Sequence, residues 1–233
     1  DFLVFPEDRK LPIRMLDEIP QRWIENGPAN EFKGDAQRNE YYTLQLGVYA
    51  AHKDLEDLKV EFSALKNGDA ELPISKLTCF NTGGIGPYGQ PFVKQLDVEQ
   101  GNVQPLWIGV DIPEDQASGK YEGIFTVSAK NTAAQTISIS LKISNEVIAD
   151  RGDSEAWRHS RLRWLNSTLG NDDEPTNGYQ PISVLGEQTY GFTGKTLQMS
   201  ENGFPASLKV KETEILNRPI SFVVETKAGM EKF

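Results

Sequence analysis

Apolar and polar residues alternate along much of the chain between Tyr41 and Ser144. A period of two is typical of strands that bury one face and expose the other. The segments that show it most clearly are YYTLQLGVYA (41–50), LKVEF (58–62), LWIGVDI (106–112) and QTISISLKIS (135–144). Helical periodicity is nearly absent, and only residues 20–27 and 52–58 are compatible with a helical turn or two. The pattern predicts an all-β protein with less than about 15% helix.

Strands with one polar face at this density favour an antiparallel, immunoglobulin-like β-sandwich, because each of two sheets then buries a single face against the other. Residues 112–127 indicate a hairpin with a longer loop, since Pro113 ends one strand and Gly119 begins the next. The alternation stops near Asp150. We therefore expect a sandwich domain over residues 1–149 and a second β-rich, sandwich-like unit over residues 150–233. The second unit would be incomplete without the rest of a longer parent protein.

Composition narrows the function classes. The chain has 34 acidic and 24 basic residues, so a nucleic-acid partner would be repelled on balance. No apolar run approaches the roughly 18 residues of a membrane-spanning segment. A single cysteine excludes an internal disulfide and a thiolate cluster, and two histidines, His52 and His159, exclude a histidine-rich metal centre. Cys79 lies in an apolar strand pattern, which favours a buried small hydrophobe over a nucleophile. We expect no cofactor.

The segment GGIGPYG (83–89) contains the spacing G-x-G-x-x-G of a dinucleotide-binding loop. That loop holds phosphate only when a strand precedes it and a helix begins within it. Gly89 and Pro91 would both fall inside the required helix, where a proline costs roughly 3 kcal/mol and a glycine about 1 kcal/mol. The sequence therefore predicts an ordinary loop without nucleotide binding.

The densest cluster of aromatic and basic residues consists of Trp157, Arg158, Arg161, Arg163 and Trp164. Two interpretations compete: a carbohydrate-binding platform with arginine donors, or a structural junction between the two units. In a strand without a bulge the two tryptophans face opposite sides, which splits a platform. Burying a tryptophan removes about 150 to 250 Å² of surface from water and is strongly stabilising. We therefore favour a buried junction.

Acidic residues follow this cluster in the segment NDDEP (171–175). Its carboxylates are potential partners for the nearby arginines. The segment also has the oxygen ligands that Ca²⁺ prefers, but it lacks the EF-hand spacing, which favours a solvated turn. Asp153, His159 and Ser160 contain the residue types of a catalytic triad. Triads are assembled in space from separate segments, so their proximity in sequence argues little for one.

Five stretches resemble the N-terminal, non-catalytic region of bacterial glycoside hydrolase-like proteins related to glycoside hydrolase family 123. They are FPEDRKLPIRMLDEIPQRWIENG (5–27), NEYYTLQLGVYA (39–50), CFNTGGIGPYGQPF (79–92), PLWIGVDIPEDQASGKYEGIFTV (105–127) and WRHSRLRWLNSTLGNDDEPTNGYQPISV (157–184). The most specific part is Arg-Leu-Arg-Trp-Leu-Asn-Ser-Thr (161–168).

This resemblance implies a β-sandwich region preceding a (β/α)₈ catalytic barrel, in a secreted, periplasmic or cell-surface protein that degrades polysaccharides or other glycans. Family 123 enzymes cleave β-linked N-acetylgalactosamine with the substrate's acetamido group as nucleophile and an adjacent Asp-Glu pair on a barrel strand. Neither Asp17-Glu18 nor Asp173-Glu174 lies in a barrel-like context, and eight βα units need about 250 residues. We therefore expect no catalytic residue here and a barrel of the same parent as the partner.

Two alternatives to an accessory region remain. One is a stand-alone carbohydrate-binding module whose candidate stacking groups are Tyr88, Trp107, Trp157, Trp164 and Tyr179. The other is a structural or adhesive module without a sugar ligand. Exposure distinguishes a binding module from a scaffold, because a binding module needs aromatic faces in water.

Overall fold

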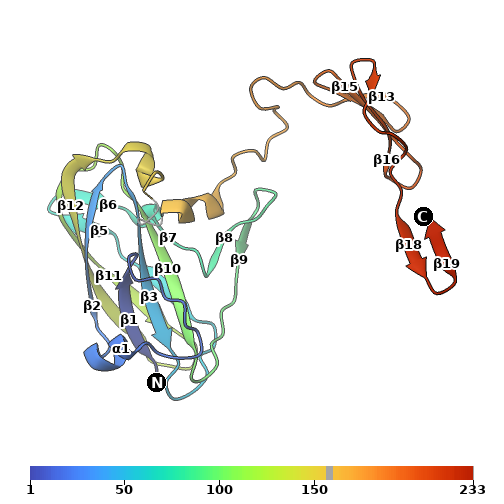
Figure 1. Ribbon diagram of the computed structural model, residues 1–233. Helices are drawn as coiled ribbons and strands as arrows, with labels where there is room; N and C mark the ends of the chain where they lie inside the picture. Colours follow the sequence, from blue (N-terminus) through green and yellow to red (C-terminus); the bar gives the residue numbers. More distant parts are fainter. Residues whose placement is uncertain (156–159, 233) are drawn as a thin grey trace. The chain divides into compact units, whose positions relative to one another are not determined.

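The computed structural model describes residues 1–155 and 160–232, and the chain divides into two compact units, Asp1–Thr168 and Leu169–Phe233 (Figure 1). The protein is 46% strand and 8% helix, which confirms the all-β prediction. The division falls after Thr168 instead of near Asp150, because the 3₁₀ helix η4 (Ser160–Asn166) contacts strands of the first unit. Each unit is described by itself below.

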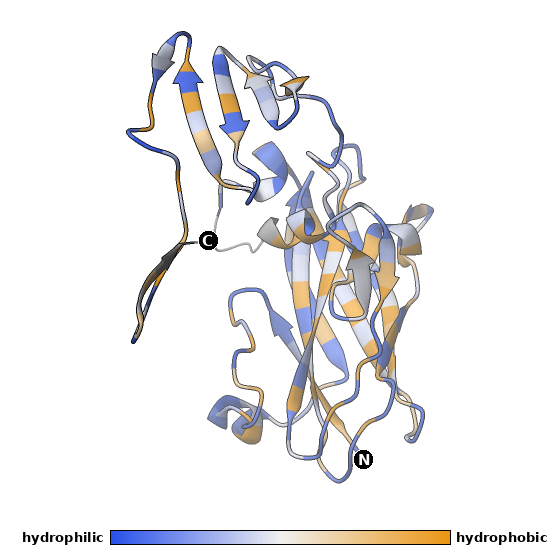
Figure 2. Cartoon of the chain, turned by 90° about the vertical axis from the view of Figure 1, so that its right-hand side faces the viewer, coloured by the Kyte–Doolittle hydropathy of each residue, from blue (hydrophilic) through white to orange (hydrophobic). Residues whose placement is uncertain are grey.

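Unit 1 contains two sheets. The first, called the β3 sheet, is antiparallel with the order β1-β3-β10-β7. Its strands are β1 (Leu3–Asp8), β3 (Tyr41–Tyr49), β10 (Val103–Asp111) and β7 (Leu77–Cys79). Hydrophobic and hydrophilic residues alternate along the strands, as the sequence predicts (Figure 2).

The second sheet, called the β12 sheet, has the order β2-β12-β11-β5-β6, and β4 also pairs with β11. Its strands are β2 (Glu31–Arg38), β12 (Gln135–Val147), β11 (Gly119–Ser128), β4 (Lys59–Phe62), β5 (Leu65–Asn67) and β6 (Ala70–Leu72). The pair β2–β12 is parallel, whereas the sequence predicted antiparallel pairing. Because β2 and β12 are far apart in the chain, no tight hairpin forces them to run in opposite directions.

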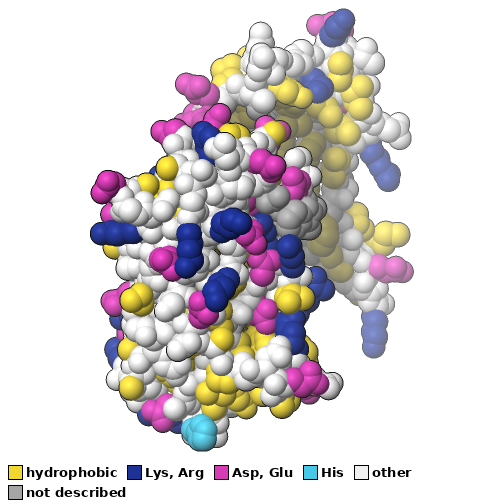
Figure 3. All heavy atoms as spheres, turned by 90° about the vertical axis from the view of Figure 1, so that its left-hand side faces the viewer, with side chains coloured by type: hydrophobic (Ala, Val, Ile, Leu, Met, Phe, Trp, Pro, Cys, Tyr) yellow, Lys and Arg dark blue, Asp and Glu magenta, His cyan; other side chains and the backbone are white. Residues whose placement is uncertain are grey.

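The outer face of the β12 sheet is polar. On the side of unit 1 where β2 and β12 lie, basic and acidic side chains are interspersed (Figure 3). Lys33 pairs with Glu31 at 2.9 Å and Lys120 pairs with Glu122 at 2.6 Å. This is the solvated strand face that the period of two predicts.

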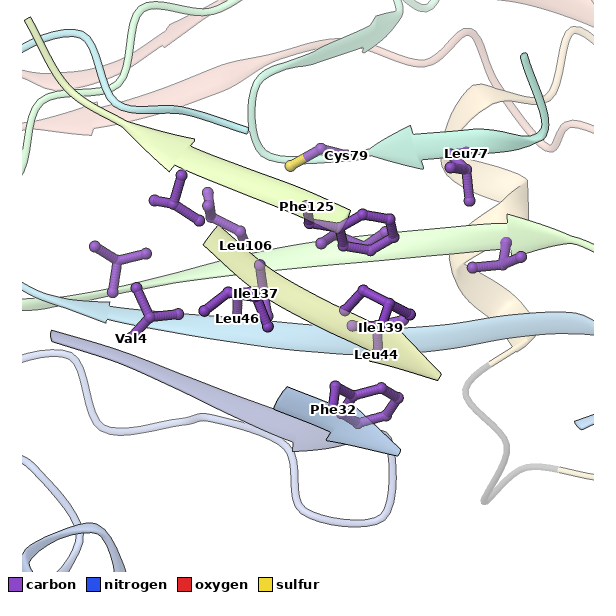
Figure 4. Close-up of a cluster of buried hydrophobic side chains, with 14 of the residues drawn as sticks. Val4, Phe32, Leu44, Leu46, Leu77, Cys79, Leu106, Phe125, Ile137 and Ile139 are labelled. Atoms are coloured by element: carbon purple, nitrogen blue, oxygen red, sulfur yellow. The ribbon is translucent and has the colours of Figure 1, made fainter. Parts of the chain in front are cut away.

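The hydrophobic core lies between the two sheets (Figure 4). Alternate residues of β3 contribute Tyr42, Leu44, Leu46 and Val48, which are fully buried. The β12 sheet contributes Phe125, Ile137, Ile139, Leu141 and Ile143. Cys79 is buried in this core, and burial raises the pKa of its thiol. The sandwich-like packing and the burial of the cysteine are therefore confirmed, whereas the immunoglobulin-like subtype stays a prediction.

The outer face of β3 is also buried, which corrects the expectation of one exposed face for each strand. Gln45 is fully buried, and its Oε1 accepts a hydrogen bond from the Ile13 N–H at 2.7 Å. Trp23, in helix α1 (Gln21–Asn26), stacks on Phe5 with ring centroids 4.3 Å apart. A Cβ at Gly47 would lie 2.3 Å from the Trp23 ring, so only a glycine leaves space for the Trp23 side chain on this face of β3. The covering segment precedes the strand and carries no periodic signal.

Unit 2 is built around one antiparallel sheet in the order β13-β14-β15-β16-β17. Its strands are β13 (Ser183–Gly186), β14 (Thr189–Phe192), β15 (Lys195–Met199), β16 (Pro205–Val210) and β17 (Thr213–Glu214), followed by the hairpin of β18 (Val223–Thr226) and β19 (Gly229–Lys232). This arrangement confirms that the second unit is β-rich.

The unit 2 sheet has one apolar and one polar face. Directly opposed residues lie on the same face of a sheet. One such row consists of Val184, Tyr190, Leu197 and Leu208, and the next consists of Ser183, Gly191, Thr196, Lys209 and Glu214. Among the described residues of unit 2 none is buried, and Val184 is 75% exposed. The described part of unit 2 therefore leaves its apolar face in contact with solvent.

Candidate functional site

The sequence-predicted cluster is only partly within the described residues. Trp157 and Arg158 lie outside them. The backbone of Arg161 is in η4, but its side chain is outside what the structure describes. Arg163 and Trp164 follow in the same 3₁₀ helix, whereas the sequence interpretation assumed a strand.

Trp164 is 63% exposed, which corrects the expectation that it is buried at a junction. The reason is the period of η4. In a 3₁₀ helix residues three apart share a face, so Arg163 and Asn166 lie together and Trp164 lies on a different face. Arg163 and Asn166 contact the rest of unit 1, as described below.

Asn166 attaches η4 to the glycine-rich segment. The Ile85 N–H donates a hydrogen bond to Asn166 Oδ1 at 3.0 Å. Residues 83–93 form a hairpin of β8 (Gly83–Ile85) and β9 (Pro91–Val93), with Tyr88 in the turn. A strand follows the glycines where a phosphate-binding loop would need a helix, which agrees with the loop interpretation.

Arg163 pairs with Asp153, upstream of η4, and not with the downstream acidic segment that the sequence suggested. Its Nε lies 3.0 Å from Asp153 Oδ2, and its Nη2 contacts the same carboxylate. Hydrogen bonding to Asp153 raises the pKa of Arg163. Asp172 instead accepts a hydrogen bond from the Glu174 N–H at 3.0 Å within its own turn.

Four residues from separate segments line a pocket of about 370 Å³, called here the arginine pocket: Tyr41, Asp111, Arg151 and Arg163. Tyr41 begins β3 and Asp111 ends β10, so both lie at the same end of the β3 sheet. Arg151 lies in the 3₁₀ segment η2 (Ala149–Gly152). Sequence reasoning found only Arg163, because nothing in the local patterns links these four segments.

Ion pairs hold the pocket together. Arg151 pairs with Asp111, and Lys76 Nζ lies 3.0 Å from Asp111 Oδ2. Burial, followed by the positive charge of Arg163, lowers the pKa of Arg151. Burial also raises the pKa of Tyr41, against a hydrogen bond with Thr78 that lowers it. The pocket therefore combines two guanidinium groups with a partly desolvated phenol.

A larger hollow of about 660 Å³ lies on the outer face of the β12 sheet. Lys33, Lys120 and Lys142 are among the residues that line it, and none of the described lining residues is aromatic. Two of these lysines already pair with neighbouring glutamates. Without an aromatic ring to stack on a sugar, this hollow is a weaker candidate for glycan binding than the arginine pocket.

The remaining candidate groups do not form a second site. Tyr88 is 89% exposed in its hairpin turn and Tyr179 is 67% exposed in unit 2, whereas Trp107 is half-buried on β10. The pairs Asp17-Glu18 and Asp173-Glu174 lie in exposed loops. Within residues 1–155 and 160–232, no group of three or more histidine, cysteine or carboxylate side chains is arranged to hold a metal ion.

Replacing Trp164 with alanine should change the free energy of unfolding by no more than about 0.5 kcal/mol, because an exposed ring loses little packing. Trp23→Ala is the matched control, since Trp23 is 3% exposed and stacked, and it should cost about 3 to 5 kcal/mol. Urea denaturation of both variants measures the difference. Equal losses would show that Trp164 has a buried structural role after all.

The geometry described so far defines an all-β protein whose first unit is sandwich-like and carries an arginine pocket at one end of a sheet. Residues 88–129 match the family model described as the glycoside hydrolase 123 N-terminal domain. This segment includes β9, β10 and β11, and β10 and β11 belong to different sheets of the sandwich. Over these residues the chain resembles the N-terminal domain of family 123 proteins.

No curated protein matches the chain. Among solved structures, a family 123 glycoside hydrolase from Clostridium perfringens, studied for glycolipid glycan hydrolysis, is 16% identical with a TM-score of 0.48. That alignment covers 63% of this chain and 27% of the other. A Bacteroides ovatus GH5 xyloglucanase bound to a XXXG heptasaccharide is 12% identical with a TM-score of 0.27, over 57% of this chain and 20% of that one. The chain therefore spans about a quarter of the family 123 structure.

Proposed function

We propose that this chain is a non-catalytic accessory region of a glycoside hydrolase, which supports a (β/α)₈ catalytic domain of the same parent protein. The observation that carries the proposal is the family match over residues 88–129. The matched strands contribute to both sheets of the sandwich, so the relationship involves its core and not only a surface loop.

The proposed setting is glycan degradation outside the cytoplasm, in a secreted, periplasmic or cell-surface enzyme. The resemblance of the sequence to family 123 supports this setting. In the described ranges no helix has the length and hydropathy needed to cross a membrane.

Within this function the chain itself should not hydrolyse glycosides. Glycoside hydrolysis needs two functional groups across one bond, commonly carboxylates roughly 5 to 10 Å apart, although a substrate group can replace one of them. The two Asp-Glu pairs of this chain, Asp17-Glu18 and Asp173-Glu174, lie in exposed loops. We expect no turnover of an aryl N-acetyl-β-galactosaminide by the chain, measured by release of the aryl alcohol.

The same assay on the full parent protein tests the accessory role. The parent should be active, and deleting residues 1–168 should lower its folded yield or melting temperature by exposing the surface that the sandwich covers. Turnover by the chain alone that is lost on replacing Glu18 or Glu174 would contradict the proposal. A parent that folds and works equally well without the sandwich would also contradict it.

A carbohydrate-binding module is the second candidate, and the exposure of Trp164 favours it, because a stacking platform needs an aromatic face in water. A glycan array probed with the chain and with Trp164→Ala separates the two functions. Binding that is lost in the variant while its melting temperature is unchanged would support the module. The third alternative, an adhesive or structural module, has no comparable observation in its favour.

A further inference from the structure

The arginine pocket has an excess of positive charge in a chain whose net charge is −10. Among the residues that line it, Arg151 and Arg163 contribute two positive charges and Asp111 contributes one negative charge, which leaves a net charge of +1. An anion that enters the pocket therefore meets a positive environment, although the protein as a whole repels it.

The two guanidinium groups retain donors for such an anion. The described contacts of Arg163 with Asp153 use Nε and Nη2, and those of Arg151 use Nη1 and Nη2. Each guanidinium has five N–H donors, so one nitrogen of each is left outside these contacts. Nη1 of Arg163 and Nε of Arg151 are therefore the donors that we assign to a bound carboxylate.

Tyr41 provides the pocket with an aromatic group. A Cβ at Gly109 would lie 2.4 Å from the Tyr41 hydroxyl oxygen and 2.6 Å from its ring, so the tyrosine rests against the backbone of β10. The C–H groups of a sugar ring pack favourably against an aromatic side chain, whose face is electron-rich. A volume of about 370 Å³ is near the lower end of ligand pockets, which range over roughly 300 to 1,000 Å³. It suits one sugar residue.

The backbone beneath Arg151 is strained. Asp150 and Arg151 have φ values of 50° and 59°, in the left-handed region that residues with a Cβ rarely adopt. Strain of this kind clusters at ligand sites, where it fixes the direction of a functional side chain. Here it fixes the segment that carries one of the two arginines.

We propose that the arginine pocket binds the carboxylate of an acidic sugar residue, with Arg151 and Arg163 as donors and Tyr41 against the sugar ring. This inference rests on the proposed role in glycan degradation and adds a ligand class to it. Neutral sugars lack the group that the two guanidinium donors select. The site would help an accessory region hold uronic-acid-containing glycans near a catalytic domain.

The test is a titration of the isotope-labelled chain, followed by NMR, with methyl β-D-glucuronide and methyl β-D-glucoside. These probes differ only in the carboxylate. The glucuronide should bind at least about tenfold more tightly, because charge-assisted hydrogen bonds are stronger than neutral ones. Its shifts should include the amides of Tyr41, Arg151 and Arg163, and its affinity should fall as salt is added. Acetate, which has no sugar ring, should bind more weakly than the glucuronide.

Arg163→Gln should weaken glucuronide binding about tenfold, and Arg163→Lys should retain part of the affinity because it keeps the charge but has fewer donors to share between Asp153 and the ligand. Lys142→Gln, on the outer face of the β12 sheet, removes the same charge elsewhere and should change the affinity less than about twofold. Melting curves of all three variants identify any that fail to fold. The comparison of the glucuronide, the glucoside and acetate uses the unaltered chain and therefore does not depend on the variants.

Three results would each overturn the inference: equal affinity for the glucoside and the glucuronide, acetate binding as tight as glucuronide binding, or a folded Arg163→Gln variant with unchanged affinity. Absence of glucuronide shifts at the pocket would overturn it as well. If the parent protein hydrolyses glycosides while the glucuronide does not bind, only the ligand class fails and the accessory role stands.

Discussion

Replacing Glu40 with alanine is expected to lower the free energy of unfolding of unit 1 by about 3 to 5 kcal/mol. Glu40 is fully buried, and its Oε1 lies 2.7 Å from Nη1 of Arg9, which is also buried. Its other carboxylate oxygen accepts a hydrogen bond from the Gln37 N–H at 2.8 Å. The variant would keep the Arg9 guanidinium in the interior without this carboxylate, and an interior charge that loses its counter-charge is strongly destabilising.

Glu31→Ala is the matched control for this experiment. It removes a carboxylate from an ion pair with Lys33 at the surface, where the Glu31 side chain is 50% exposed and the Lys33 side chain is 70% exposed. It should lower the free energy of unfolding by no more than about 1 kcal/mol. Urea denaturation followed by tryptophan fluorescence measures both losses. The double variant Arg9→Met/Glu40→Leu should recover most of the stability, because it removes both charges together. Equal losses for Glu40→Ala and Glu31→Ala would show that the interior pair is accessible to water.

Unit 2 produced alone as residues 169–233 is expected to show no cooperative thermal transition, whereas residues 1–168 should unfold cooperatively. Unit 1 buries a core between two sheets. In the described part of unit 2 no residue is buried, and one apolar row of its sheet faces solvent. A single sheet needs another layer against its apolar face to be stable.

Differential scanning calorimetry of the two fragments measures this difference, and binding of a dye specific for exposed apolar surface should be strong for residues 169–233 and weak for residues 1–168. Leu197→Ser replaces a residue of the apolar row and should lower dye binding by unit 2. A sharp calorimetric transition of isolated unit 2 would contradict the prediction and would mean that its sheet is covered in solution.

Several features of the fold were predictable because they depend on local chemistry. The even positions of β3, from Tyr42 to Val48, are buried as the period of two predicts, and the residues from Ile137 to Ile143 on β12 face the same core. The short helix α1 forms within one of the two segments that the sequence allowed to be helical. The hairpin at residues 83–93 agrees with the prediction that glycine and proline residues prevent a helix in this segment.

Other features were not predictable because they depend on which segments meet. The cover over Gln45 comes from residues around Ile13 and Trp23, whose pattern does not reveal what they touch. The parallel pairing of β2 with β12 joins strands separated by most of unit 1. The exposure of Trp164 follows from the 3₁₀ period of η4, which the sequence did not indicate.

The sequence by itself determined the all-β class, the alternation that builds the core and the resemblance of residues 88–129 to the glycoside hydrolase 123 N-terminal domain, because each depends on residue types at short spacing. Only the tertiary structure decided the candidate site. Pairing of β3 with β10 places Tyr41 beside Asp111 at one end of the β3 sheet. The segments η2 and η4 lie at the same end and add Arg151 and Arg163 to the pocket. Which four segments lie together depends on the packing free energy of the whole unit, and a local sequence pattern does not reveal it.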